Sequence, residues 1–198
     1  DTLVVGSPFS FFGGQNGFMF VDFGGVASVG REMRINETGV LGLGGQGQLD
    51  LNGGALLDDY GTLDPTPTLT AQIAAGYANG AWNGNGITSS VARADGRLGI
   101  AIVDESAWTA STFAGEGLDG TGVLLRVTYR GDANGDLAVN LDDFTTLAAR
   151  FGSVGLWRHG DFDYNGLVNM DDFAALAANF GLIYAPPMAR SALPEPVN

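Results

Sequence analysis

The chain contains no cysteine and no lysine, and its single histidine is His159. Without Cys it can form no disulfide, no thiol nucleophile and no Cys-ligated zinc or iron–sulfur centre. One His is too few for a three-His zinc enzyme, and the lack of Lys excludes Schiff-base chemistry. No apolar run approaches the roughly 20 residues of a membrane-spanning helix, so we expect no membrane span in this chain.

Positive charge is also scarce. All nine basic residues are Arg, against 22 acidic residues, and the net charge is −13. An acidic chain without a basic stretch lacks the electrostatic footprint of nucleic-acid binding, so we expect no nucleic-acid partner. The acidic residues are concentrated in one part of the chain, since eight of the 17 Asp residues lie between positions 132 and 172.

Glycine is abundant, at 32 residues, and hydrophobic residues make up 45% of the chain. The Gly residues follow no collagen period, and this hydrophobic content favours a packed core over disorder. A small extracellular domain usually needs a staple, and a bound metal could replace the missing disulfides. The chain begins at Asp1, which we interpret as a processed end from which an export signal has been removed.

Residues 1–130 consist mostly of short apolar runs separated by Gly, which is typical of β-strands and tight turns. An apolar-x-apolar pair recurs with a step of eight residues (41 − 33 = 8). The members of this series are Met33, Ile35, Leu41, Leu43, Leu49, Leu51 and Leu57. Such pairs predict short strands with one buried face, arranged either as a meander within a sandwich or as successive sides of a small β-solenoid.

Helices and further strands are predicted in the second half of this β-rich part. The predicted helices span about 69–78, capped by Thr68 or Thr70, and about 89–95, and the predicted strands are Leu98–Val103 and Val123–Tyr129. In the last strand, alternate apolar residues share a face, while Arg126 and Thr128 point away from it. The strand leads directly into Gly131, which predicts a stiff joint to the segment that follows.

That segment is a repeat. Residues 131–152 and 160–181 are near copies with an offset of 29 (161 − 132 = 29). Each copy places oxygen-bearing side chains at loop positions 1, 3, 5, 9 and 12, and a backbone carbonyl at position 7, which is the spacing of EF-hand-type calcium loops. The candidate ligands are Asp132, Asn134, Asp136, the carbonyl of Ala138, Asn140 and Asp143 in the first copy, and Asp161, Asp163, Asn165, the carbonyl of Leu167, Asn169 and Asp172 in the second. We predict two Ca²⁺ sites; Mg²⁺ fits less well, because it retains several waters.

The two loops differ at position 6, where the chain turns sharply with a positive φ. The second loop has Gly166 there, whereas the first has Leu137. A Leu in the left-handed region costs on the order of 1–2 kcal/mol. Gly135 could shift the turn instead. We predict that the first site binds calcium more weakly than the second, and a calorimetric titration with two equally tight sites would contradict this.

Each loop leads into a helix with apolar residues at helical spacing. These residues are Leu141, Phe144, Leu147, Ala148 and Phe151 in the first helix, and Met170, Phe173, Leu176, Ala177 and Phe180 in the second. Gly152 and Gly181 stand where a helix commonly ends in a left-handed residue. The matched apolar faces predict two loop–helix units packed about a pseudo-two-fold axis. The tail after Gly181 is Pro-rich and predicted to be extended.

This duplicated loop and helix, with the pattern D-x-N-x-D-G-x-V-N-x-x-D, resembles the dockerin module, the calcium-binding partner of cohesin domains. The resemblance covers residues 131–182 and implies two bound calcium ions and a cohesin-like partner. Dockerins contact cohesins through loop positions 10 and 11, which here are Leu141-Asp142 and Met170-Asp171 instead of small hydroxyl pairs. We therefore expect a calcium-locked cap or an assembly interface in place of cohesin binding.

A second resemblance lies in the tail. Residues Leu193–Pro196 read LPEP, which is similar to the PEP sorting signal of bacterial exosortase substrates. Together with the dockerin-like repeats and the Gly-rich strands, it implies an exported, planctomycete-type bacterial protein of the cell surface or extracellular matrix. We accordingly expect an extracellular location.

Other candidate residues point less clearly to a function. Trp82, Trp108 and Trp157 could stack on sugar rings, but packing in a core or interface is the more usual role of Trp. The acids near strand ends, Asp58, Asp59, Asp104 and Glu105, could form a glycosidase pair but more often stand in solvated turns. We expect His159 to orient the turn before the second loop. No Ser–His–Asp constellation or phosphate loop is recognisable, and we predict that the protein is not an enzyme.

The sequence thus predicts a multidomain, mainly β fold. Residues 1–130 form a sandwich or a short β-solenoid, residues 131–182 form a small α dockerin-like domain with two calcium loops, and residues 183–198 form a tail. The predicted function is that of a secreted calcium-binding structural protein, a subunit of a filament, surface layer or matrix that self-assembles into a homopolymer. Residues Thr2–Phe12 could add as a strand to a neighbouring subunit. The alternative is a non-catalytic anchoring or carbohydrate-binding module with a cohesin-like or polysaccharide partner.

Overall fold

The computed structural model describes residues 47–60, 63–109, 111 and 117–186, together with the backbone of short strands within 2–43 and 112–116. The strands before the first helix are β1 (Thr2–Val5), β2 (Phe9–Phe11), β3 (Phe18–Val21), β4 (Val26–Val29), β5 (Glu32–Ile35), β6 (Val40–Leu43), β7 (Gln48–Asp50) and β8 (Ala55–Asp59). They are followed by α1 (Thr66–Tyr77), β9 (Gly86–Thr88), α2 (Ser90–Ala94), β10 (Leu98–Asp104), β11 (Thr112–Phe113), β12 (Glu116–Gly117), β13 (Gly122–Tyr129), α3 (Leu141–Arg150) and α4 (Met170–Asn179). None of the helices in this part of the chain is long and apolar enough to cross a membrane.

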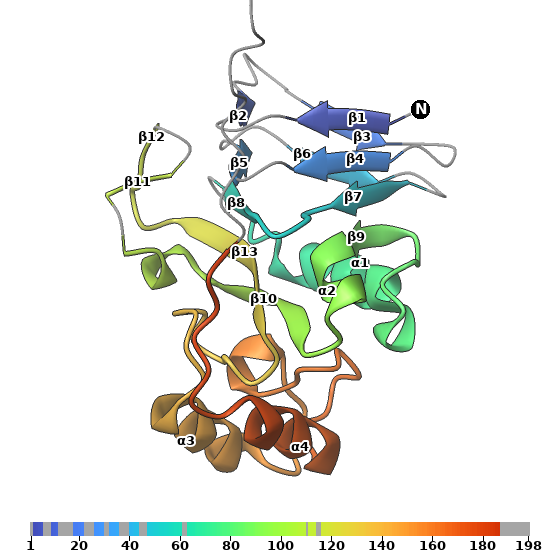
Figure 1. The fold of residues 1–198 in the computed structure, drawn as a ribbon. Coiled ribbons are helices and arrows are strands. Elements are labelled where there is room, and N and C mark those ends of the chain that lie inside the picture. Colours follow the sequence, from blue (N-terminus) through green and yellow to red (C-terminus); the bar gives the residue numbers. More distant parts are fainter. Residues whose placement is uncertain are drawn as a thin grey trace, which may run out of the picture.

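The N-terminal strands pair in parallel with strands one coil further along the chain (Figure 1). Thr2 lies opposite Val26, and Val26 lies opposite Gln48, which gives offsets of 24 (26 − 2) and 22 (48 − 26) residues. A meander would pair sequence neighbours in antiparallel fashion, whereas a coil of about three eight-residue steps gives the observed offset. The parallel pairing of the described strands thus favours the coil over the meander, and the β-solenoid itself stays a prediction. The side chains of the series from Met33 to Leu43 lie outside the described residues, whereas Leu49, Leu51 and Leu57 are completely buried.

After the parallel strands, the sheet continues with strands that pair in antiparallel fashion. One five-stranded sheet has the order β10-β13-β8-β5-β2, in which β8, β13 and β10 pair in antiparallel fashion. Residues 122–128 of β13 are buried on both faces of the sheet. Arg126 and Thr128 do alternate with the apolar residues as predicted, but the first loop of the repeat covers them, so their face does not contact solvent.

Helix α1 begins three residues before the predicted start (69 − 66 = 3). Neither Thr68 nor Thr70 caps it: Pro65 is the N-cap, and the Asp64 carboxylate accepts a hydrogen bond from the backbone N–H of Thr66 at 2.8 Å. Prolines suit the first turn because the N–H groups there have no partner within the helix. Helix α2 lies within the predicted range and is capped by Ser89.

The hydrophobic core is continuous across residue 130. Its buried members in the sheet include Ile100 and Leu125, and its members in the repeat include Leu147, Trp157 and Phe162. The division into a mainly β domain and an α domain stays a prediction, but no gap in the core marks the boundary. The described part of the tail packs against the first loop of the repeat. Tyr184 is buried, and its N–H donates to the Leu137 carbonyl at 2.7 Å. The LPEP motif lies outside the described residues.

Candidate metal centre

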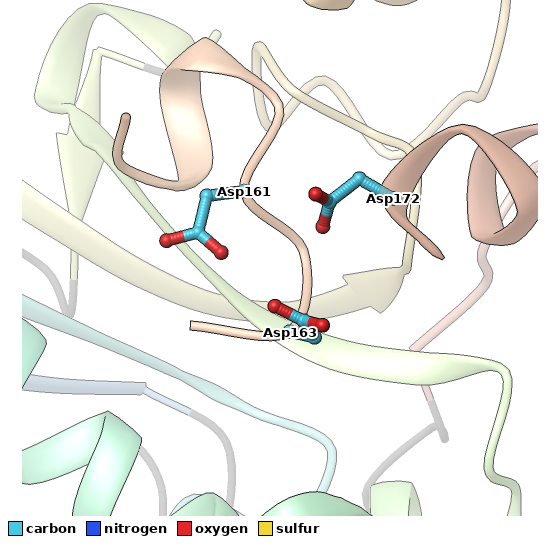
Figure 2. A group of neighbouring side chains, drawn as sticks. All are labelled: Asp161, Asp163 and Asp172. Atoms are coloured by element: carbon cyan, nitrogen blue, oxygen red, sulfur yellow. The ribbon is translucent and has the colours of Figure 1, made fainter. Parts of the chain in front are cut away.

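In the second loop, Asp161, Asp163 and Asp172 point toward one common space (Figure 2). Each offers a carboxylate oxygen, and these oxygens lie within 4.8 Å of one another. Asp161 and Asp172 are buried and Asp163 is partly buried, so the space lies at the edge of the protein interior. Within the described part of the chain, no other cluster of three or more His or acidic side chains is arranged in this way.

Backbone hydrogen bonds fix the first and last carboxylates of this loop. Asp161 accepts from Asn165 N at 3.1 Å and from Gly166 N at 3.0 Å, which folds the loop around its side chain. Asp172 accepts from Phe162 N at 2.7 Å and from Asn169 N at 2.8 Å, so a residue in the first turn of α4 also holds the start of the loop. The two carboxylates are thus preorganised by the chain that carries them.

The amide residues have hydrogen-bonding roles of their own. The side-chain oxygen of Asn169 caps α4 by accepting from Asp171 N at 2.7 Å, and Asn140 caps α3 in the same way at 2.8 Å. The side chain of Asn165 donates to Asp163 at 3.0 Å, which places position 5 beside position 3. Calcium takes six to eight oxygen ligands, so the carboxylates need these amides, the position-7 carbonyl or water to complete a site.

Burial disfavours negative charge in this loop. Burial first, and then the neighbouring Asp172 and Asp163, raise the pKa of Asp161 to about 7. Burial also raises the pKa of Asp172, although backbone hydrogen bonds from Asn169 and Phe162 oppose the increase. The convergence of three carboxyl groups favours a divalent cation, because its charge offsets both their mutual repulsion and the solvation that the buried ones have lost.

The first loop has a similar backbone path but a different carboxylate arrangement. Asp132 is completely buried and accepts hydrogen bonds from Gly135 N at 2.7 Å, Leu137 N at 2.9 Å and the Thr128 hydroxyl at 2.6 Å. The position equivalent to Thr128 in the second loop is Trp157 (128 + 29 = 157), which has no hydroxyl group. Burial raises the pKa of Asp132 to about 6. The Thr128 hydroxyl therefore donates a hydrogen bond to the Asp132 carboxylate. Asp161 has no hydroxyl donor at the equivalent position, because Trp157 stands there.

Among the described residues, the carboxylates of the first loop do not form a group as close as that of the second. Asp143 accepts from Ala133 N and Asn140 N, both at 2.8 Å, as Asp172 does in its own loop. Asp136 is exposed and accepts from Asn134 at 3.1 Å and from Ala138 N at 2.9 Å. The structure thus places all the predicted residues in two matching loops but groups three carboxylates in the second loop alone.

Both loops turn through the left-handed region at position 6, where φ is +76° for Leu137 and +86° for Gly166. Position 4 is also left-handed, with φ values of +73° for Gly135 and +58° for Tyr164. Each loop therefore contains one Gly and one strained residue, in opposite order. Because the second loop has a comparable cost at Tyr164, Leu137 alone cannot weaken the first site. The prediction of a weaker first site now depends on the arrangement of its carboxylates.

Tyr164 couples the second loop to the sheet. Its ring stacks on Trp157 at a centroid distance of 5.5 Å and meets the edges of Tyr77 and Trp82 at 5.0 and 6.0 Å. Its hydroxyl accepts from Ile100 N at 2.7 Å and donates to Ile100 O at 3.0 Å, which satisfies both backbone groups on the outer edge of β10. Tyr164 was not among the residues predicted for the site. The available signal was a large aromatic side chain between two ligand positions, where the first loop has Gly135.

Of three further hydrogen bonds, one links the two loops of the repeat and two join the repeat to Arg130, directly after β13. The Trp157 indole donates to the Asp132 carbonyl at 2.6 Å, which links the two loops. The Arg130 side chain donates to Phe162 O at 3.1 Å, and the Asn179 amide donates to Arg130 O at 2.7 Å. Together with the continuous core, these bonds are consistent with a stiff joint after β13, which stays a prediction.

The other candidate residues have structural positions. Trp82 and Trp157 are each 1% exposed, so neither can stack on a sugar ring, and Trp108 lies beneath the Arg126 guanidinium at 5.0 Å from the ring centroid. His159 accepts from Leu156 N at 3.2 Å, which orients the turn before the second loop.

The expectation that the strand-end acids stand in solvated turns is wrong for three of the four. Asp58, Asp59 and Glu105 are buried, whereas Asp104 is exposed. The reason is that the paired strands and the turn after β10 cover these positions. Burial, and next the charge of Asp59, raise the pKa of Asp58 to about 7.

Replacing Tyr164 by Phe tests the coupling between the second loop and the sheet. The ring cluster remains, but Ile100 N and O lose their partner at a half-buried edge. Leaving such groups unsatisfied costs about 1–3 kcal/mol, and we expect a loss of this size in the free energy of unfolding measured by urea denaturation. A Tyr60→Phe variant provides the matched control at a partly buried Tyr elsewhere in the core. Equal stability of Tyr164→Phe and the parent protein would show that the hydroxyl is dispensable.

Comparisons with known proteins identify no relative: no protein-family model, no curated protein and no solved structure matches this chain.

Proposed function

We propose that the chain is an exported calcium-binding structural protein in which a bound ion fixes the repeat to the sheet. The observation that carries this proposal is the convergence of Asp161, Asp163 and Asp172 within 4.8 Å on a loop that is itself attached to the sheet. Hard carboxylate oxygens in this number are typical calcium ligands. The dockerin-like ligand spacing supports the same ion, and the absence of Cys makes an ion the available staple.

The attachment explains why the ion would have a structural effect. Tyr164 lies between ligand positions 3 and 5, so any change in the loop moves the ring that closes the edge of β10. In the absence of an ion, repulsion among the carboxylates opposes the closed loop. A bound ion removes that repulsion and holds Tyr164 against Ile100. Calcium at extracellular concentrations would then keep α3 and α4 docked.

Self-assembly is the second part of the proposal. In the described sheets β1 and β2 are outermost strands, each with a neighbour on one side. An outermost strand offers unpaired backbone groups to another chain, as expected for a subunit that extends by strand addition. The carbohydrate-binding alternative has less support, since two of its three candidate stacking residues, Trp82 and Trp157, are buried.

The test is to examine the full chain by electron microscopy and sedimentation, in millimolar calcium and in chelator. We expect calcium binding by calorimetry, assembled particles in calcium and their loss in chelator. A variant that lacks residues 1–12 should bind calcium equally well but fail to grow beyond small oligomers. Absence of calcium binding at millimolar concentration would refute the metal part of the proposal. Polymers that persist in the deleted variant would refute the role of the N-terminal strands.

A further inference from the structure

The two helices of the repeat expose an unusually apolar surface, here called the paired apolar face. It consists of Leu141, Phe144, Phe151 and Val154 of the first unit and Met170, Phe173, Phe180 and Ile183 of the second. Among the described residues, the other exposed large hydrophobic side chains are Leu63 and Leu167. Exposed apolar residues are therefore concentrated on α3, α4 and the segments that follow them. In Figure 1 these helices lie side by side at the end of the molecule away from β1.

The paired apolar face has an internal two-fold symmetry, and equivalent side chains also have similar exposed fractions. Residues related by the offset of 29 are exposed to nearly the same degree: 64% and 65% for Leu141 and Met170, and 38% and 37% for Phe144 and Phe173. The exposed fractions are 49% and 53% for Phe151 and Phe180 at the helix ends, and 77% and 75% for Val154 and Ile183 beyond them. The Phe144 and Phe173 rings touch at 6.4 Å between centroids, so the two halves meet at the pseudo-axis.

Neither the fold nor the metal loops account for this face. Each helix already buries another side, with Leu147 and Asp143 in α3 and Leu176 and Asp172 in α4. The exposed side contains no ligand candidate. Large contiguous apolar patches on soluble proteins mark interaction sites.

We propose that the paired apolar face binds the same face of a second copy of this chain about a two-fold axis. An isologous contact requires a patch that is complementary to itself, and a patch with its own two-fold places apolar groups opposite apolar groups throughout. The area is sufficient: eight side chains that expose on the order of 100 Å² each approach the roughly 800 Å² per partner of a standard interface. The proposal locates one contact of the proposed self-assembly and thus rests on that function.

The charge of the chain makes the salt dependence of binding differ between a second copy and a basic partner. Two copies with a net charge of −13 repel each other, and the exposed Asp142 and Asp171 flank the face. Salt screens that repulsion, so self-association through an apolar contact should strengthen as ionic strength rises. Binding of a basic partner would weaken under the same change.

The experiment is sedimentation of the full chain over a concentration series in calcium, with calorimetry on the same samples. The test variant is Leu141→Asp with Met170→Asp, because both side chains are well exposed and acidic residues are favourable in the first turn of a helix. Leu63→Asp, at an 83% exposed Leu elsewhere, is the matched control. We expect the dissociation constant of the dimer to fall as salt rises from about 0.1 to about 0.5 M, because the Debye length shortens over this range. The double variant should form a more than tenfold weaker dimer, and the control should dimerise like the parent chain.

The outcomes separate the two proposals. A parent chain that binds calcium but stays monomeric overturns this inference and leaves the metal proposal intact. Dimers that form without any calcium binding, and that the double variant loses, overturn the metal proposal and support this inference. A double variant that dimerises as tightly as the parent chain also overturns the inference, because it assigns the contact to another surface.

Discussion

Saturating calcium should raise the free energy of unfolding at pH 7 by about 4 kcal/mol when the free ion exceeds its dissociation constant a thousandfold. The gain arises because the ion binds the folded loops, whereas the unfolded chain does not hold the carboxylates together. Asp161 and Asp172 supply the buried part of the site, so their loop is stabilised most. Urea denaturation in calcium and in chelator measures the difference directly.

The repeat offers a matched set of variants for this measurement. Asp172→Asn removes a carboxylate from the grouped site, and Asp143→Asn removes its equivalent in the first loop. The neighbouring exposed acids provide the controls, as Asp171→Asn and Asp142→Asn, with the same change of charge. We expect Asp172→Asn to lose most of the calcium-dependent gain, Asp143→Asn a smaller part and the controls almost none. Equal losses at positions 172 and 143 would contradict the predicted difference between the sites.

The free energy of unfolding should depend on pH in chelator, and this dependence should disappear in calcium. The pKa values of Asp161 and Asp132 are raised to about 7 and about 6 in the folded chain by burial. In chelator the unfolded chain ionises first, near pH 4, while the folded chain keeps its protons up to pH 6–7. Stability without metal therefore falls as the pH rises through this window. In calcium the folded carboxylates are ionised and bound, so the fall should disappear, and calcium binding at pH 6 should release protons.

The local pattern of the repeat was readable from the sequence because its determinants are local. Gly152 and Gly181 follow their helices in the left-handed region, and position 6 turns with positive φ in both loops. Each feature depends on a few adjacent residues. The eight-residue period likewise indicated short strands, but the choice between meander and solenoid depends on pairing across 22–24 residues, which composition does not encode.

The contacts that join the repeat to the sheet could not be predicted, because they depend on the tertiary arrangement. Nothing near Tyr164 in the sequence indicates that its hydroxyl meets Ile100, which is 64 residues away. The same holds for Thr128, whose hydroxyl distinguishes Asp132 from Asp161. Burial of Arg126 was missed for a related reason: alternation identifies the two faces of a strand, but not whether a second layer covers the polar one.

Adding one methyl group at Gly99 should destabilise the protein by about 1–3 kcal/mol, the usual cost of overpacking a core. A Cβ at this position would lie 2.6 and 2.8 Å from two carbons of the Trp157 ring and 3.2 Å from the Tyr164 hydroxyl. Trp157 cannot retreat easily, because it is buried and its indole donates to Asp132 O at 2.6 Å. The methyl group therefore separates the second loop from the sheet, where Tyr164 and Trp157 meet β10.

Gly96→Ala provides the matched control for this substitution, because a Cβ at Gly96 meets no atom within 4 Å. In the control, the lower entropy of the unfolded chain should leave stability unchanged or raise it by up to about 1 kcal/mol. A double-mutant cycle with Trp157→Phe identifies the cause, since the smaller ring vacates the space that the methyl group needs. We expect Gly99→Ala to cost at least about 1 kcal/mol less in the Trp157→Phe background, the coupling typical of residues in contact. If Gly99→Ala costs the same in both backgrounds, the close approach of Gly99 to Trp157 is not what holds the repeat against the sheet.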